Sequence, residues 1–355
     1  MDLATTCGQL LFCGFAAGPA PGALRELVAR GARGGVILFK RNIGPLDALA
    51  AELEALAAAA PAELPLLVSV DQEGGRVARI GAPLLAVPPA MRLGSGLSEQ
   101  DIAFVAEVQS RQLRALGFTM NYAPVLDVHS RPENPVIGDR SFGTNAEAAA
   151  RGALAFARGM AAGGLLACGK HFPGHGDTTK DSHLELPEVA HERARLEAVE
   201  LTPFRAAAAA RLPAMMTAHV RYPALDARPA TLARSIATDL LRGGLGFEGV
   251  LVSDDLEMKA IADRWGTGEA AVLAVEAGCD ALLVCSDARA QDEAHAALVA
   301  RAERDGAFRA RCEEACARVV AMKRACPPRA DHAAFRALTT SPEAERAARL
   351  LGALP

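Results

Sequence analysis

The sequence has no long apolar segment and no excess of positive charge. No run approaches the roughly 20 consecutive apolar residues of a membrane-spanning helix. Lysine and arginine number 38 against 42 aspartates and glutamates, which gives a formal net charge of −4, and the basic residues are scattered. We therefore expect no nucleic-acid partner and no anionic membrane surface as a partner.

The N-terminus also lacks the positively charged segment of a secretory signal peptide. The stretch MDLATTCGQLLFCGF carries Asp2 and no lysine or arginine before its apolar run. Most of the eight cysteines lie in apolar runs such as LLFCGF and ALLVC, which is typical of small buried hydrophobic residues rather than of a disulfide framework. The segment CEEAC has no partner histidine pair for zinc. We expect a cytoplasmic protein in a reducing setting.

What the sequence does contain is an alternation of short apolar runs and longer segments of helical period. Eight runs read as strands, at residues 9–15, 34–40, 64–70, 118–128, 165–172, 212–220, 249–255 and 279–285. Several of the helical segments between them begin at Ser, Asn or Thr and end at Gly, as helices commonly do. The strands are apolar without alternation, which favours a parallel sheet that is covered on both faces.

This order predicts an α/β fold in which residues 1–355 form one (β/α)8 TIM-type barrel with a C-terminal helical tail. The tail begins at about residue 286, and we expect its amphipathic helices to close the barrel. A doubly wound open sheet is the alternative. No linker divides the 355 residues, so we expect one domain.

Polar side chains follow the predicted strands at the end where barrel enzymes bind their ligands. They are Asp71, Glu73, Arg76, Arg79, Asp127, Arg140, Lys170, His171, His219, Asp254 and Asp255. Buried charges persist only where they are paired or used, so a functional site is expected there. Successive residues of a strand point to opposite faces, so we expect only one of Asp254 and Asp255 to face the barrel mouth.

The stretch GKHFPGHGDTTKDSHLELP, residues 169–187, contains three histidines and two aspartates within a short span. Pro173 and Gly174 separate His171 from His175 and exclude a helix that would present both to a metal ion. A phosphate loop would lead into a helix, and HLELP does not read as one. We interpret the stretch as a mobile catalytic loop whose glycines, between Pro173 and Gly176, act as hinges.

Asp181 and His183 lie two residues apart, so in an extended segment they point to the same side and can hydrogen-bond. A carboxylate on one imidazole nitrogen leaves the other nitrogen to exchange a proton, which suits general acid and base work. A local contact within a turn is the alternative, and the spacing by itself leaves it open.

Four motifs occur in order between residues 71 and 258: DQEGGRV, GDRSFG, KHFPGHGDTTKDSHLELP and SDDLEM. Together they resemble the single-domain branch of glycoside hydrolase family 3, the cytoplasmic bacterial β-N-acetylglucosaminidases (β-hexosaminidases) of peptidoglycan recycling. The resemblance implies that Asp254 is the nucleophile and that Asp181 and His183 form the acid/base dyad. Asp255 is the competing candidate for the nucleophile. The sugar-binding residues that it implies are Asp71, Arg79, Arg140, Lys170 and His171.

The resemblance further implies a retaining enzyme that removes the non-reducing terminal N-acetylglucosamine from muropeptides of the GlcNAc-1,6-anhydroMurNAc type. The partner would be this small carbohydrate, with no metal and no cofactor, and we expect a monomer. Aromatic residues are scarce, with one Trp, two Tyr and twelve Phe. That scarcity favours a small pocket over a long groove lined with stacking platforms.

Three other functions stay open from the sequence. A phosphorylase of the same fold would use phosphate instead of water. A Schiff-base lyase would use Lys170 at the end of its strand, and a sugar-binding barrel would not catalyse at all. The sequence assigns no role to His175, Asp177 or His219.

Overall fold

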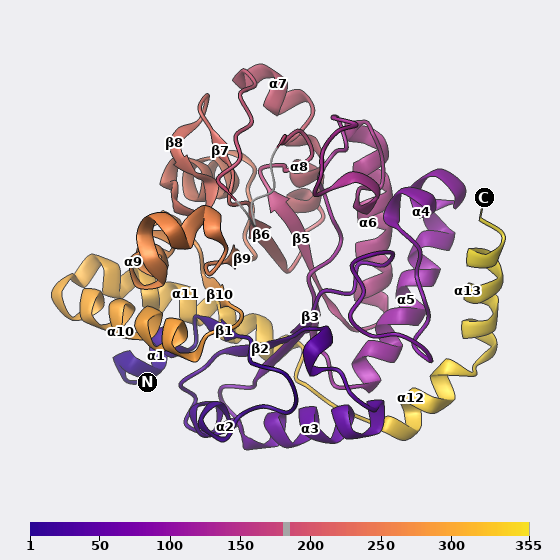
Figure 1. Cartoon of the computed structure of the whole chain (residues 1–355), viewed down its shortest axis with the longest axis horizontal. Coiled ribbons are helices and arrows are strands. Elements are labelled where there is room, and N and C mark those ends of the chain that lie inside the picture. The colour runs from indigo at the N-terminus through magenta and orange to yellow at the C-terminus, as the bar shows by residue number, and fades with distance from the viewer. Residues whose placement is uncertain (180–184, 355) are drawn as a thin grey trace.

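The computed structural model describes residues 1–179 and 185–354. Within them, eight parallel strands close into a barrel, which confirms the predicted (β/α)8 fold and excludes the open sheet (Figure 1). Around the barrel the order is β1, β10, β9, β6, β5, β4, β3 and β2, and the barrel closes where Leu11 pairs with Leu282. The barrel strands are β1 (Leu11–Cys13), β2 (Gly35–Leu38), β3 (Leu67–Val70), β4 (Met120–Asn121), β5 (Leu166–Phe172), β6 (Ala214–Thr217), β9 (Val250–Asp255) and β10 (Ala281–Val284).

Helices surround the barrel (Figure 1). They are α1 (Leu3–Gly8), α2 (Gly22–Ala29), α3 (Leu46–Ala59), α4 (Ala90–Gly96), α5 (Glu99–Ala115), α6 (Ala146–Ala162), α7 (Arg193–Ala198), α8 (Thr202–Ala209), α9 (Lys259–Ala277), α10 (Ala288–Arg304), α11 (Gly306–Ala325), α12 (His332–Thr339) and α13 (Pro342–Gly352). Short helical turns are η1 (Lys40–Asn42), η2 (Gly138–Arg140) and η3 (Ala230–Leu232), and η4 (Ser235–Gly244) is a π-helix. Ser98, Asn145 and Ser341 cap α5, α6 and α13 by accepting backbone N–H bonds, as the start signals predict.

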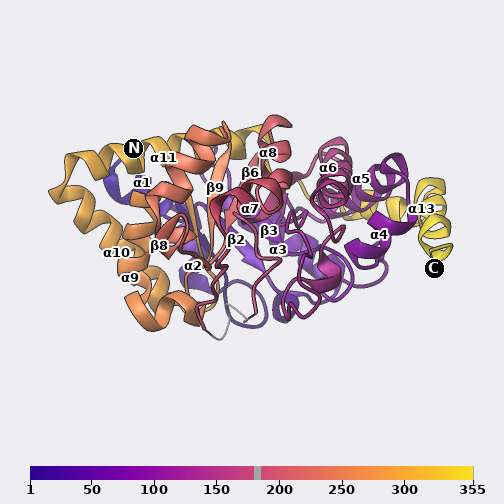
Figure 2. The same cartoon turned by 90° about the horizontal axis from the view of Figure 1, so that it is seen from above.

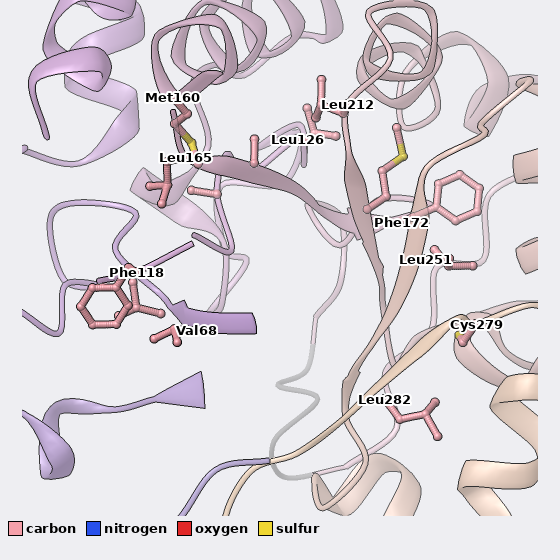
Figure 3. Close-up of a cluster of buried hydrophobic side chains, with 14 of the residues drawn as sticks. Val68, Phe118, Leu126, Met160, Leu165, Phe172, Leu212, Leu251, Cys279 and Leu282 are labelled. Atoms are coloured by element: carbon pink, nitrogen blue, oxygen red, sulfur yellow. The ribbon is translucent and has the colours of Figure 1, made fainter. Parts of the chain in front are cut away.

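Both faces of the barrel wall are buried, which explains why the strands are apolar without alternation. In β3, Leu67 belongs to the cluster inside the barrel, whereas Val68 belongs to the layer between the strands and the helices. Figure 3 shows part of this outer layer, in which Val68 lies near Phe118 and Leu251 lies near the strand of Leu282. All eight cysteines lie in the described part of the chain and are buried and free of disulfides.

The tail closes the end of the barrel where the strands begin. Val319 and Met322 of α11 pack against the cluster inside the barrel. Lys323 of the same helix donates to Gln9 Oε1 at 2.5 Å and to the Gly34 carbonyl at 3.0 Å, just before β1 and β2. In Figure 2, α11 runs along the edge of the molecule where the N-terminus also lies. The opposite end, where the strands finish, is left for the site.

The structure differs from the expectation in a few short elements. The strand predicted at 118–128 is paired regularly only at Met120–Asn121, because Pro124 has no N–H to donate. Pairing continues by single bonds, such as Leu126 N to the Lys170 carbonyl at 2.6 Å. The helices α1 and α12 and the hairpin of β7 (Arg221–Tyr222) and β8 (Asp226–Pro229) were not predicted, because they are too short to show a period.

Among the described helices, none combines the length and the apolar character that crossing a membrane would require.

Candidate active site

A cavity of about 380 Å³ lies at the carboxyl ends of the barrel strands. This volume is within the range of roughly 300 to 1,000 Å³ that is common for small-molecule sites. The described residues that the sequence singled out for catalysis or sugar binding all line it: Asp71, Arg79, Arg140, Lys170, His171 and Asp254. They follow β3, lie on η2 and end β5 and β9, so closure of the barrel brings together residues that are far apart in the sequence.

Cations and carboxylates pair with one another on the wall of this cavity. Lys170 Nζ lies 2.6 Å from Asp71 Oδ1 and 2.6 Å from Glu73 Oε1. Arg140 contacts the same Glu73 through Nε and Nη2, each at 2.8 Å. Arg79 Nη2 lies 3.5 Å from Asp71 Oδ2, a weaker contact. The side chains of Lys170 and Glu73 are only 3% and 5% exposed, so each charge depends on these partners.

The ion pairs decide the charge states. Burial alone would raise the pKa of Glu73, but the charges of Arg140 and Lys170 hold that pKa well below its usual range. Burial alone would lower the pKa of Lys170, but Asp71 and Glu73 raise it above its ordinary value. Both groups are therefore charged at neutral pH, and the cavity presents oriented, charged hydrogen-bond donors.

Glu73 was not among the predicted sugar-binding residues, although it links two of them. The signal in the sequence was its position two residues after Asp71, which places both carboxylates on one side of an extended segment. The side chain of Gln72, between them, folds the segment back, because its Oε1 accepts from the N–H groups of Arg79 and Ile80 at 2.8 and 3.0 Å. That turn brings Arg79 over to the carboxylates.

Asp127, which follows β4, is fully buried and organises two histidines. Its Oδ2 lies 2.7 Å from His171 Nδ1, and its Oδ1 accepts from the backbone N–H of His175 at 2.6 Å. Burial would raise the pKa of Asp127, but the charge of His171 and the bond from its ring hold that pKa below its usual value. This contact leaves His171 Nε2 facing Arg140, whose Nη2 lies 3.5 Å away. Asp127 stands out in the sequence as a strand-end carboxylate but was not predicted as a site residue.

His175 also lines the cavity, and the sequence had assigned it no role. Its Nδ1 lies 2.8 Å from Thr178 Oγ1, and burial, together with the charge of His171, lowers its pKa to about 4. Two neighbouring positions require glycine for reasons of backbone conformation and packing. Gly174 has a φ of +132°, and a Cβ on Gly176 would lie 1.7 Å from the carbonyl oxygen of Val128. The hinge role remains a prediction.

Asp254 and Asp255 both contribute to the lining of the cavity. That only one of the two side chains faces the barrel mouth stays a prediction. The register between β9 and β10 shifts at this strand end: Val252 pairs with Ala281, but Leu283 pairs with Asp255. Such an irregularity re-aims side chains at the end of a strand.

The two aspartates differ in their partners. The side chain of Asp255 accepts from the backbone N–H groups of Glu257 at 3.1 Å and Cys285 at 3.2 Å, and burial raises its pKa to about 7. Its own N–H donates to Asp254 Oδ1 at 2.8 Å. Asp255 is thus tied to the backbone around it and also orients Asp254.

His219, at the end of β6, supports this same strand end. Its Nε2 lies 2.9 Å from the carbonyl oxygen of Asp255, and its Nδ1 lies 2.7 Å from Thr231 Oγ1. It is completely buried. The histidine therefore links the end of β6 to the end of β9.

The predicted acid/base residues Asp181 and His183 lie outside the described residues. Asp177, shortly before them, carries several contacts: Arg131 Nη2 at 2.9 Å, Ser130 Oγ at 2.8 Å and His191 Nε2 at 3.1 Å. Burial would raise the pKa of Asp177, but the bonds from Ser130 and Arg131 lower it. Asp177 is thus an anchor at the base of the loop.

In the described part of the chain, one group of side chains has the spacing of metal ligands. Atoms of Asp177, His191 and Glu200 lie within 4.8 Å of one another. Arg131 already pairs with Asp177, and Arg195 Nη2 lies 3.2 Å from Glu200 Oε1. Since these arginines already supply positive charge, a metal ion there would be repelled unless they moved.

Phe39 and Arg41, which follow β2, also line the cavity. Neither was predicted from the sequence as a site residue. The guanidinium of Arg41 lies over the Phe39 ring, 4.5 Å from its centroid, and that of Arg79 lies 5.7 Å from it. The segment FKRN, residues 39–42, belongs to no recognisable motif. A pair of charged residues after a strand is too common to indicate a functional site.

The comparisons with known proteins agree with this architecture. The model of the "Glycosyl hydrolase family 3 N terminal domain" matches residues 4–322. A β-hexosaminidase of Neisseria meningitidis serogroup C (strain 053442) is 42% identical over 270 residues, which make up 73% of this chain and 73% of that protein.

Solved structures give the same result. NagZ from Neisseria gonorrhoeae, in complex with N-trifluoroacetyl-D-glucosamine, superposes with a TM-score of 0.81 at 32% identity, over 97% of each chain. A glycoside hydrolase family 3 β-N-acetylglucosaminidase from Paenibacillus sp. str. FPU-7 gives a TM-score of 0.88 at 42% identity. That match covers 92% of this chain but only 62% of the Paenibacillus chain. The chain belongs to glycosyl hydrolase family 3.

Proposed function

We propose that this chain is a retaining exo-β-N-acetylglucosaminidase that removes a terminal N-acetylglucosamine through a covalent glycosyl-enzyme. Its family and its relatives show that the chain is a glycoside hydrolase of the β-N-acetylhexosaminidase type. The finer proposal is supported by one observation. Asp254 lines the same cavity as the ion-paired donors Lys170 and Arg140, so a sugar held by those donors would lie against a carboxylate.

In the first step, an Asp254 oxygen forms a bond to the anomeric carbon while the bond from that carbon to the leaving oxygen breaks. Protonated His183, oriented by Asp181, gives its proton to the leaving oxygen. In the second step, a water oxygen attacks the same carbon, its proton goes to His183, and the carboxylate of Asp254 is released. Each step inverts the configuration at the anomeric carbon, so the two steps together retain it.

The charged donors serve the binding of the terminal sugar. Lys170, Arg140, Arg79 and His171 would donate hydrogen bonds to its hydroxyls and its N-acetyl group, and Asp71 would accept from a hydroxyl. Because these groups are already held by one another, little side-chain entropy is lost when the sugar binds.

The physiological substrate that we propose is a muropeptide fragment of the GlcNAc-1,6-anhydroMurNAc type, in the cytoplasm. We further propose that residues 1–355 act as one catalytic domain and as a monomer, without metal or cofactor.

The charge state of Lys170 argues against the Schiff-base lyase. A lysine that attacks a carbonyl must be neutral, and enzymes lower the pKa of such a lysine. Two carboxylates raise the pKa of Lys170 instead. Borohydride trapping with a carbonyl substrate would be expected to leave Lys170 unmodified.

The test is hydrolysis of an aryl β-N-acetylglucosaminide, compared with the aryl β-glucoside, and followed by proton NMR. The proposal expects cleavage of the first substrate with the β-anomer as the first product. An α-anomer as the first product would contradict the retaining mechanism. Formation of sugar 1-phosphate when phosphate is added would establish the phosphorylase, and binding without turnover would establish the sugar-binding barrel.

A further inference from the structure

Two cysteine thiols meet at the end of the barrel that lies opposite the cavity. Cys7 lies on α1, just before β1, and Cys312 lies on α11, the tail helix that closes this end. The two helices pack beside each other near the N-terminus (Figure 2). The thiol of Cys312 donates a hydrogen bond to the sulfur of Cys7, and both residues are completely buried. The pair thus joins helices from the two ends of the barrel sequence.

The hydrogen bond makes the two thiols unequal. It lowers the pKa of Cys7, because the sulfur of Cys7 accepts the bond and its thiolate form is favoured. The same bond, together with burial, raises the pKa of Cys312 above its ordinary value. The thiolate is the form of cysteine that reacts with oxidants. Cys7 is therefore the more reactive of the two, and Cys312 lies in place as the thiol that reacts next.

A second cavity lies next to the pair and gives a small oxidant a route towards it. This cavity has a volume of about 690 Å³, and its lining includes Thr5 and Thr6 of α1 and Cys316 of α11. Thr6 precedes Cys7, and Cys316 follows Cys312 by one helical turn. Because α1 has only six residues, it can open locally while the barrel stays folded. Local opening of this kind brings the buried thiols into contact with small solutes.

We propose that Cys7 and Cys312 are a site of reversible oxidation, at which a peroxide forms a disulfide that fixes the tail helix α11 to α1. The Cys7 thiolate attacks one oxygen of hydrogen peroxide, the O–O bond breaks, and a sulfenic acid and hydroxide result. The sulfur of Cys312 then attacks the sulfur of Cys7, and its proton leaves with the sulfenic oxygen as water. Two thiols are oxidised to one disulfide, and the peroxide is reduced to two waters. A dithiol reductant reverses the reaction, so the bond forms only under oxidation.

The place of the pair in the fold decides what the disulfide does. All eight strands of the barrel lie between Cys7 and Cys312 in the sequence, so the bond closes the whole barrel into one covalent loop. A disulfide that closes a long loop restricts the unfolded chain strongly and so stabilises the folded state. Neither cysteine lines the cavity at the other end of the barrel. Oxidation therefore stabilises the protein and leaves its activity unchanged.

The test treats the reduced wild-type protein with hydrogen peroxide and maps its peptides under non-reducing conditions. We expect a loss in intact mass of two hydrogen atoms and a pair of peptides joined through Cys7 and Cys312, which dithiothreitol separates. The melting temperature should rise by about 5 °C on oxidation and return on reduction. The rate of hydrolysis of an aryl β-N-acetylglucosaminide should stay the same.

Three alanine variants identify the cysteines that react. Cys7→Ala and Cys312→Ala should each abolish the cross-link and the rise in melting temperature. Cys316→Ala is the matched control, because Cys316 is also buried on α11 but its Sγ lies 4.0 Å from the Sδ of Met1, a thioether that cannot form a disulfide. This control should keep both effects. Circular dichroism checks the fold of each variant, and the peptide map of the wild type tests the pairing without any substitution.

The proposal is overturned if peroxide joins a different pair of cysteines, or if all eight thiols still react with a thiol reagent after treatment and denaturation. Oxidation of Cys7 to a sulfinic acid without a cross-link would overturn it as well, because Cys312 would then not act as the second thiol. A cross-link that leaves the melting temperature unchanged would show that it does not fix α11 to the barrel. None of these outcomes depends on the proposed function, since mass and melting temperature report them.

Discussion

Arg140 and Glu73 form a double ion pair in the wall of the cavity, with Nε and Nη2 of the arginine each 2.8 Å from a carboxylate oxygen. The same carboxylate lies 2.6 Å from Lys170 Nζ. One buried acid thus orients two cations that come from η2 and from the end of β5. The geometry of the wall that we propose binds the sugar therefore depends on Glu73, a residue that was not among the predicted sugar-binding residues.

Replacing that acid tests this dependence. In Glu73→Gln, two buried cations lose a charged partner, so we expect the free energy of unfolding to fall by about 3 kcal/mol and kcat/KM to fall by at least tenfold. Urea unfolding and hydrolysis of an aryl β-N-acetylglucosaminide measure the two effects. Asp139→Asn is the matched control, because it breaks an exposed pair with Arg76 and should cost less than about 1 kcal/mol. Equal behaviour of the two variants would contradict the role of Glu73.

The carboxyl group of Asp255 should make stability depend on pH. Its pKa is raised from 3.8 to about 7, so between these values the unfolded chain has released the proton that the folded chain still holds. The free energy of unfolding should therefore fall as the pH rises from about 4 to about 7 and then level off. The full effect is at most about 4 kcal/mol.

Asp255→Asn removes this titration while keeping a side-chain oxygen that can accept from the backbone N–H groups of Glu257 and Cys285. We expect the melting temperature of the wild type, relative to this variant, to be higher at pH 5 than at pH 8. Parallel pH profiles for the two proteins would show that the group is not protonated in the folded state.

Gly176 tests the packing of the loop that follows β5. A Cβ at this position would meet the Val128 carbonyl oxygen at 1.7 Å, so Gly176→Ala must displace backbone. We expect a loss of at least about 2 kcal/mol of stability, by the cost of overpacking. Gly22→Ala is the control, because a Cβ there meets nothing within 4 Å. A Gly176→Ala protein as stable as the control would mean that the loop adjusts freely.

The predicted acid His183 is tested through the leaving group. His183→Ala should slow the cleavage of substrates with poor leaving groups by orders of magnitude and of good ones much less, because only poor leaving groups need protonation. Rates for a series of aryl β-N-acetylglucosaminides of graded leaving-group pKa measure this. A uniform loss across the series would reject the acid role.

The barrel could be predicted from the sequence because its strands are buried on both faces and leave unbroken apolar runs, as in 249–255. The charged residues at the strand ends stood out against those runs, which is why Asp71, Lys170 and Asp254 could be found. The hairpin of β7 and β8 was missed because two to four residues show no periodicity.

Several features of the site could not be predicted from the sequence for a different reason. The shift of register at the end of β9 depends on its pairing with β10, which no local pattern encodes. Glu73 and Asp127 act on other site residues, and Arg41 gains its position from carbonyls at Phe15 and Cys285. Such relations are set by tertiary contacts.

We propose that Asp254 is the nucleophile, and a comparison of two aspartate variants tests this role most directly. Hydrolysis of an aryl β-N-acetylglucosaminide is measured for the wild type, Asp254→Asn and Asp255→Asn, with the fold of each checked by circular dichroism. We expect Asp254→Asn to lose several orders of magnitude in kcat, because covalent catalysis is removed, and Asp255→Asn to lose far less. A loss of only a few-fold in Asp254→Asn, or a larger loss in Asp255→Asn, would contradict the account.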